Sequence, residues 1–163
     1  NINSGREGGQ TGMKALKRLS YFAAAALAVL LVQPALAQDT ATLVIHVQNV
    51  SSKGGVLRLG LYDAAHYPYD KSQPVASADV TAQAGETIVT LQGVVPGEYA
   101  IETYQDVNAN DKMDQTLIGL PEEPYGFSRD ARPFLSRPGF DAVKITLAPG
   151  ENSQTIHLQN TGK

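Results

Sequence analysis

Hydrophobic and polar residues alternate along much of the chain after residue 38. Apolar side chains occupy every second position in residues 42–47, and the same pattern returns in residues 56–62. A period of two is the pattern of a β-strand that buries one face. Because residues 51–55, Ser-Ser-Lys-Gly-Gly, favour a turn, we expect these two runs to pair as a hairpin.

Shorter strand-like runs follow along the rest of the chain, separated by turns rich in Gly, Pro and Asn. They are residues 75–81, 87–91, 99–104, 142–147 and 154–158. No helical period occurs after residue 38. The pattern therefore predicts an all-β fold, a single antiparallel β-sandwich of about seven strands.

The segment between the strands that end near residue 105 and begin near residue 140 has no strand or helix pattern. At more than thirty residues it is far longer than most loops in compact domains. Its composition differs from that of disordered segments, because large apolar side chains recur in it. These are Leu117, Ile118, Leu120, Tyr125, Phe127 and Phe134. We expect one long ordered loop, packed by these side chains.

The N-terminal region has the pattern of an export signal. Met13 is followed by positive residues, an apolar run that ends near Val32, and the small-residue cleavage site Ala35-Leu36-Ala37. The run is shorter than the roughly 20 residues needed to span a bilayer. We expect residues 1–12 to be a non-native upstream tail, 13–37 a signal peptide, and 38–163 one periplasmic or secreted domain without a membrane span.

Composition narrows the possible partners and chemistry. The chain has 13 Lys and Arg residues and 16 Asp and Glu residues. The first 37 residues hold four of the basic residues and one of the acidic residues. Residues 38–163 therefore have nine basic and 15 acidic residues, a net charge of −6. An acidic domain of this kind argues against a nucleic-acid partner. Because the chain has no cysteine, disulfides and thiolate chemistry are excluded.

One acidic stretch has the spacing of a calcium loop. Asp106, Asn108, Asn110 and Asp114 stand at relative positions 1, 3, 5 and 9, the order in which such loops present oxygen ligands. The carbonyl of Lys112 would add another oxygen. The spacing predicts a Ca²⁺ site at the end of the strand that leads into this stretch.

The same stretch departs from an EF-hand. Position 6, normally Gly, is Asp111, and position 12, normally a bidentate Glu, is Leu117. The missing ligands would come from water or from Glu123 or Glu122. With an incomplete ligand set we expect a weak site, with a dissociation constant on the order of 10⁻⁴–10⁻³ M. The alternative is a metal-free turn rich in Asp and Asn.

A second candidate surface follows the acidic stretch. Tyr125, Phe127 and Phe134 are interleaved with Arg129, Arg132 and Arg137, a combination suited to a sugar or an anionic polymer. Alternatively, the aromatic rings pack the long loop onto the sheet and the arginines pair with carboxylates of residues 106–123. The tyrosines of residues 63–70, Tyr67 and Tyr69, are candidates for the rim of the same surface.

Two resemblances add to this interpretation. The turn Pro96-Gly97-Glu98-Tyr99 resembles one in transthyretin-like sandwich modules, where Gly97 permits a positive φ and the Tyr99 hydroxyl finds a backbone partner. A longer likeness spans roughly residues 43–147.

The longer likeness is to the bacterial family catalogued as domain of unknown function 2141. The residues that carry it are Gly97-Glu98-Tyr99-Ala100-Ile101, then Asp106-x-Asn108-x-Asn110-x-Lys112-x-Asp114, then Gly119-x-Pro121-x-Glu123-Pro124-Tyr125-Gly126-Phe127-Ser128. The resemblance implies an exported single-domain β-sandwich with no established activity. The chain departs from the family at Asp111, where Gly is usual.

No nucleophile elbow, metalloprotease helix or phosphate loop is present in the sequence. We therefore expect a non-catalytic exported protein with a calcium loop, acting as a binding or envelope-interaction module, with a glycan or an envelope protein as possible partner. The alternative is a carbohydrate- or peptide-binding module. A hydrolase using Glu122 and Glu123 as acid and base is the least favoured reading.

Overall fold

The computed structural model describes residues 39–67, 73–134 and 136–160, which belong to one compact unit. The expected upstream tail 1–12, signal peptide 13–37 and Tyr69 lie outside these residues. Within the described part of the chain, no helix is long and apolar enough to cross a bilayer.

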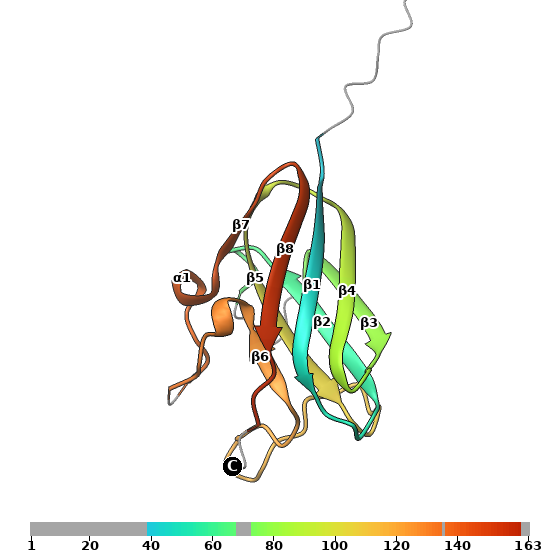
Figure 1. The fold of residues 1–163 in the computed structure, drawn as a ribbon. Helices are drawn as coiled ribbons and strands as arrows, with labels where there is room; N and C mark the ends of the chain where they lie inside the picture. The colour runs from blue at the N-terminus through green and yellow to red at the C-terminus, as the bar shows by residue number, and fades with distance from the viewer. Residues whose placement is uncertain (1–38, 68–72, 135, 161–163) are drawn as a thin grey trace, which may run out of the picture. The chain divides into compact units, whose positions relative to one another are not determined.

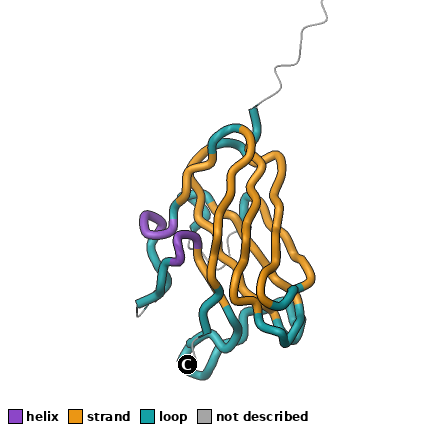
Figure 2. Tube along the Cα trace, in the orientation of Figure 1, coloured by secondary structure: helices purple, strands orange, loops and turns teal. Residues whose placement is uncertain are grey.

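The described residues form eight strands and two very short helices (Figures 1 and 2). The strands are β1 (Ala41–Val50), β2 (Val56–Tyr62), β3 (Ala76–Thr81), β4 (Gly85–Val94), β5 (Gly97–Asp106), β6 (Tyr125–Phe127), β7 (Ile145–Leu147) and β8 (Gly150–His157). The helices are the 3-10 turn η1 (Ser128–Asp130) and α1 (Phe140–Val143). The prediction of an all-β protein is confirmed.

The strands make two sheets. One has the order β4-β1-β8, with β1 antiparallel to β4 and parallel to β8. The other has the order β3-β2-β5-β6, and β7 pairs with the first residues of β5. The expected hairpin of residues 42–47 with 56–62 is wrong, because β1 and β2 lie in different sheets.

The inward faces of the two sheets explain that error. The alternate apolar residues of β1 and β2 belong to one buried cluster together with residues of β4, β5, β7 and β8. Leu43 and Ile45 of β1 and Leu57 and Leu61 of β2 are completely buried in it. Two strands with the same alternation can therefore face each other across the core from different sheets, or lie side by side in one sheet.

The corner before β5 bears out one sequence expectation and corrects another. The Tyr99 hydroxyl donates a hydrogen bond to the Val95 carbonyl (2.7 Å), as predicted. Gly97, however, does not have a positive φ; the left-handed position falls at Gly93, with φ 71°. The tight backbone geometry therefore lies near the end of β4 and not at the start of β5.

The long segment 106–139 contains more structure than predicted. It crosses back to the sheet as β6, where Tyr125 and Phe127 are buried. The other four side chains expected to pack it are exposed: Leu117, Ile118, Leu120 and Phe134. Only the two aromatic residues that enter the sheet hold this segment as predicted.

A buried serine closes the gap between β6 and β7 along the edge of β5. The Ser128 Oγ accepts a hydrogen bond from the backbone N–H of Ile101 (2.9 Å) and donates one to the Val143 carbonyl. Ser128 thereby supplies the pairing that a strand residue would otherwise give to Ile101. A three-residue strand and two short helices can therefore border β5 without orphaning these two buried backbone groups.

Replacing Ser128 with Ala should destabilise the protein by about 3 kcal/mol, because one buried N–H and one buried C=O lose their partner. Urea unfolding measures the change. Ser77→Ala, at an exposed position of β3, is the matched control and should stay within about 0.5 kcal/mol of the parent. Equal stability of the two variants would contradict the role given to Ser128.

Candidate functional site

The outer face of the five-stranded sheet carries a second apolar cluster. Glu102 and Tyr104 of β5 point outward, because Thr103 and Gln105, which alternate with them, are buried on the core side. The cluster is built mainly from aromatic residues of β2, β5, β6 and the segments around them. Its members are Tyr62, Tyr67, Ala100, Tyr104, Met113, Tyr125, Phe127, Ala131, Phe140 and Val143.

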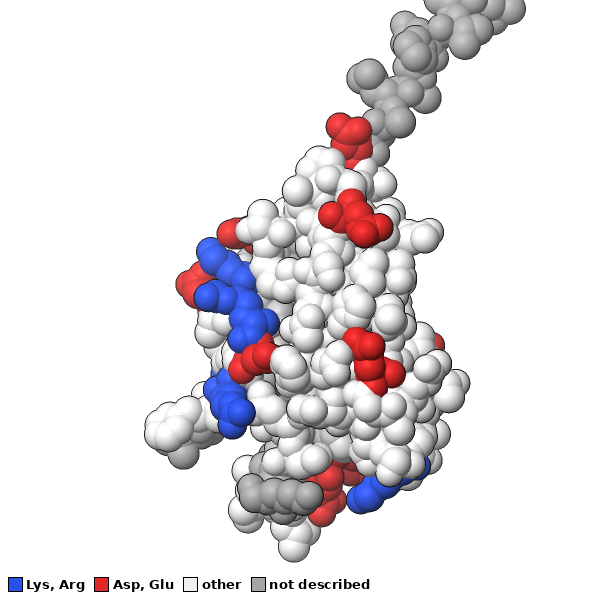
Figure 3. Space-filling view, in the orientation of Figure 1, with Lys and Arg blue, Asp and Glu red and all other residues white. Residues whose placement is uncertain are grey.

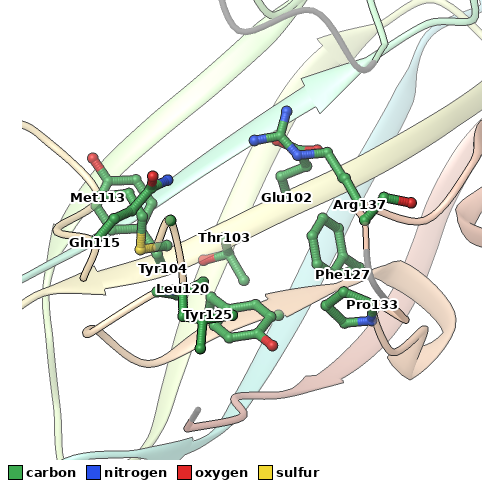
Figure 4. Close-up of a pocket in the computed structure, with 14 residues that line it drawn as sticks. Glu102, Thr103, Tyr104, Met113, Gln115, Leu120, Tyr125, Phe127, Pro133 and Arg137 are labelled. Atoms are coloured by element: carbon green, nitrogen blue, oxygen red, sulfur yellow. The ribbon is translucent and has the colours of Figure 1, made fainter. Parts of the chain in front are cut away.

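A cleft of about 570 Å³ lies on this face. Its floor is formed by outward residues of β5 and by Tyr125 and Phe127 of β6, whose rings meet edge to face at 6.0 Å. Figure 4 shows Gln115 and Leu120 on one side of the cleft and Arg137 on the other. The cleft therefore lies between two parts of the long segment, one from 113 to 121 and the other with Pro133, Ser136 and Arg137.

Polar groups in the cleft are few and placed toward its ends. Arg137 Nε lies 3.5 Å from Glu102 Oε1, so a guanidinium and a carboxylate stand together at one end. Tyr104 lies toward the other end. Burial raises the pKa of the Tyr104 hydroxyl, although the charge of Arg58 counteracts this, so the hydroxyl is protonated at neutral pH.

The predicted calcium loop, residues 106–114, starts at the last residue of β5. Asp106 is fully buried, and its carboxylate accepts the backbone N–H groups of Asn110 (3.1 Å) and Asp111 (2.9 Å). The side-chain amides of Asn108 (2.7 Å) and Asn110 (3.0 Å) both donate to the Asp114 carboxylate. The side chains of the predicted ligand positions are thus all engaged in hydrogen bonds within the loop.

Asp111 has a backbone conformation that glycine adopts more readily than other residues. Its φ is 65°, in the left-handed region, where Asp is one of the less costly L residues. Its N–H donates to Asp106, while its side chain reaches outward to Arg58. The loop therefore keeps its turn without the usual glycine. Lys112 contributes its own N–H to the Asn110 side chain (2.9 Å).

Arg58 is the functional residue that sequence reasoning missed. Its Nε donates to Asp106 (2.8 Å), its Nη1 to Asp79 of β3 (2.7 Å), and its Nη2 to Asp111. We expected arginines of the 129–137 region to pair with the carboxylates of residues 106–123, but Asp106 and Asp111 pair with Arg58. Arg58 stands on the outward face of a strand 48 residues before Asp106, so no local signal connects the two.

Glu123 closes the base of the loop. It is 5% exposed, and its two carboxylate oxygens accept the N–H groups of Val107 (2.8 Å) and Asp114 (3.2 Å). Glu122 is exposed, and its N–H pairs with the Asp114 carbonyl (2.8 Å). Glu123 therefore holds the loop from a buried position, whereas the side chain of Glu122 lies at the surface.

Residues 114–122 form a small hairpin, which we call the finger. Gln115 and Pro121 face each other across it, and the N–H of Thr116 pairs with the Leu120 carbonyl (2.8 Å). One side of the finger is the wall of the cleft. Because Glu123 and Asp114 hold its base, the shape of the cleft depends on the 106–114 loop.

The remaining predicted surface residues lie elsewhere. Arg129 and Arg132 are exposed and do not line the cleft; Arg129 Nη1 donates to the Asp141 carbonyl (3.2 Å). Figure 3 shows Lys and Arg side chains along the side of the molecule that carries α1, with acidic side chains between them. Tyr67 is buried, and its hydroxyl donates to the Pro138 carbonyl (2.7 Å), so it supports the outer cluster and does not form a rim.

Among the described residues, no group of three or more His, Cys, Asp or Glu side chains is placed to hold a metal ion. The oxygens of the 106–114 loop come from a mixture of carboxylates and asparagine amides. The calcium site therefore stays a prediction that depends on this mixed set.

The electrostatics of Asp106 make the loop sensitive to acid. Burial alone raises the pKa of this carboxyl, but the hydrogen bond from Arg58 and those from the N–H groups of Asp111 and Asn110 outweigh it, so its pKa is lowered. A carboxyl group whose pKa is lower in the folded than in the unfolded protein stabilises the fold. This stabilisation is complete above the unfolded-state pKa, about 4, and is lost as pH falls through the folded-state pKa.

Asp106→Asn should therefore reduce the free energy of unfolding at pH 7 by about 3 kcal/mol, because an amide cannot accept the same buried donors. The difference from the parent should shrink between about pH 5 and pH 2 as the parent carboxyl is protonated. Urea unfolding across this range measures it, with Asp141→Asn at an exposed carboxylate as the control at neutral pH. A difference that stays constant down to pH 2 would argue against this account.

The fold and the site together define an all-β protein with a ligand-sized cleft on the outer face of one sheet and an Asp/Asn loop beside it. Residues 45–156 match the family described as "Uncharacterized protein conserved in bacteria (DUF2141)", and the chain belongs to this family. No curated protein and no solved structure matches the chain.

Proposed function

We propose that this protein is an exported, non-catalytic β-sandwich that binds a carbohydrate in the cleft over β5 and β6. The observation that carries the proposal is the cleft itself, with aromatic rings on its floor and the pair Glu102 and Arg137 at one end. The core shared by both sheets supports the sandwich. The leader pattern of residues 13–37 supports export.

The chemistry of the lining favours a sugar. Its volume lies within the 300–1,000 Å³ typical of small-molecule sites. The half-buried ring of Tyr104 offers an apolar face to the C–H groups of a pyranose, while a carboxylate and a guanidinium bind its hydroxyls. A peptide that adds to a sheet needs an unpaired strand edge, whereas this cleft opens on a sheet face whose backbone groups pair within the sheet.

The calcium loop has a role in this proposal as the support of the finger. Three N–H donors engage the Asp106 carboxylate, which leaves one of its roughly four lone-pair sites for an ion. Rotation of the Asn108 and Asn110 amides would bring their oxygens beside Asp114 for an ion, at the cost of the hydrogen bonds that these oxygens accept from the N–H groups of Asn110 (3.2 Å) and Lys112 (2.9 Å). The positive charge of Arg58 opposes a second cation, which agrees with the weak affinity expected above.

A hydrolase is less well supported. A general acid or base must be free to exchange a proton with substrate, but both oxygens of Glu123 are engaged by backbone N–H groups. Glu122 alone does not provide the paired acid and base that the hydrolase hypothesis requires.

Leu120→Ala tests the cleft without disturbing the core, because Leu120 is 45% exposed and lies on the finger. For an oligosaccharide selected from a glycan array, we expect calorimetry to show about fivefold to tenfold weaker binding, the loss of part of one apolar contact. Ile88→Ala, which removes a 54% exposed side chain from the other sheet, is the matched control. Unchanged affinity in Leu120→Ala, or no binding to the array, would refute the proposed site.

Asp114→Asn tests the ion, because Asp114 belongs to the predicted ligand set but does not pair with Arg58. Saturating Ca²⁺, at about 100 times its dissociation constant, should stabilise the parent by about 2.7 kcal/mol and raise its thermal midpoint by several degrees relative to EDTA. MgCl₂ should not reproduce the shift. The variant should lose it, and Asp141→Asn should keep it. A parent whose midpoint is the same in EDTA and in CaCl₂ would mean a purely hydrogen-bonded turn.

A further inference from the structure

A second hollow lies on the same sheet face as the cleft. It has a volume of about 160 Å³ and is lined mainly by residues of β2, including Arg58 and Gly60, with Asp79 of β3 at its edge. Glu102 and Tyr104 of β5 line both the cleft and this hollow. The two depressions therefore meet over β5.

The strand register places their lining residues in two rows that cross the sheet. The first row runs from β3 to β6 through Asp79, Arg58, Tyr104 and Tyr125. The second runs through Ser77, Gly60, Glu102 and Phe127. With neighbouring strands about 4.8 Å apart, three spacings make a path of about 14 Å. This length is more than one sugar ring covers.

Over β2 the path crosses the ring of Tyr62, which lies against Gly60. An added Cβ at Gly60 would lie 2.7 Å from this ring, so a larger residue does not fit beneath it. The Tyr62 ring therefore lines the second hollow between Ser77 and Glu102. A ligand in the cleft can continue toward β3 across this ring.

The two ends of the path differ in charge. At the β2–β3 end, Arg58 is paired with three carboxylates, those of Asp79, Asp106 and Asp111, and these four side chains carry a formal charge of −2. At the β6 end, Arg137 stands opposite Glu102. The guanidinium of Arg58 is used by its own carboxylates, so this end attracts a cation and disfavours an anion.

We propose that the cleft and the second hollow form one groove that binds a linear oligosaccharide with protonated amino groups, one of which lies over Asp79. This inference rests on the proposed carbohydrate function and adds the length and the charge of the ligand. The chain lies across the strands, with sugar faces on Tyr62 and Tyr104, which are both half-buried. The acidic end sets its direction.

The first experiment compares glucosamine oligomers of one to six units with N-acetylglucosamine oligomers of the same lengths, by calorimetry on the parent protein. The two series share their backbone; acetylation removes the charge of the amino group and adds an acetyl group, so the dependence on salt isolates the contribution of charge. We expect affinity to rise with length until the chain spans the groove, and the charged series to bind about fivefold tighter. The preference should fall as salt is raised.

The second experiment locates the preference. Asp79→Asn should lower the ratio of affinities between the charged and the acetylated hexamer to less than about half its parent value, because Asp79 is half-exposed at the acidic end. Glu151→Gln removes the same charge from β8 in the other sheet and should leave the ratio unchanged. Thermal midpoints of both variants confirm that they are folded.

The possible outcomes distinguish failure of the proposed groove from failure of the proposed carbohydrate function. Equal binding of both series, affinity that stops rising at one unit, or a ratio unaffected by Asp79→Asn overturns the groove while leaving a carbohydrate in the cleft. Binding of oligolysine in preference to every oligosaccharide overturns the groove in favour of a peptide. A glycan array without any bound sugar overturns the proposed function itself.

Discussion

The pairing of Arg58 with Asp106 is the interaction on which the candidate site depends. Asp106 is a fully buried carboxylate at the end of a strand, and such a charge is tolerated only when it is paired and hydrogen-bonded. By accepting Arg58 and two backbone N–H groups, it orients the 106–114 loop relative to β2 and β3. The loop, through Asp114 and Glu123, then sets the base of the finger.

The cleft is a consequence of this arrangement together with the aromatic outer face of the five-stranded sheet. β6 adds Tyr125 and Phe127 beside β5, and the cleft over them is bordered by the finger and by Pro133, Ser136 and Arg137. One sheet face is thereby covered at its margins and open between them. The same face continues over Gly60 to the carboxylates around Arg58, so apolar, acidic and basic groups follow one another along a single path.

Sequence reasoning predicted the strands with long periods of two well and the connections between them poorly. It identified the runs of β1 and β2 because alternation is a local property of the chain, but it could not tell side-by-side pairing from packing across a shared core. It missed β6, since three residues carry no period. The structure of the finger was not predicted for another reason: Leu117 and Ile118 are apolar residues of the kind that usually pack, yet they are exposed at the tip of a turn.

The order of residues along the chain was enough to show an all-β domain, its family, an acidic composition and the Asp/Asn spacing of the 106–114 loop, because each depends on neighbours in sequence. The tertiary structure alone decided that Arg58 supplies the counter-charge of Asp106, that Ser128 completes the edge of β5, and that an aromatic cleft opens beside the finger. These features depend on contacts between residues 15 to 48 positions apart, and no local pattern records them.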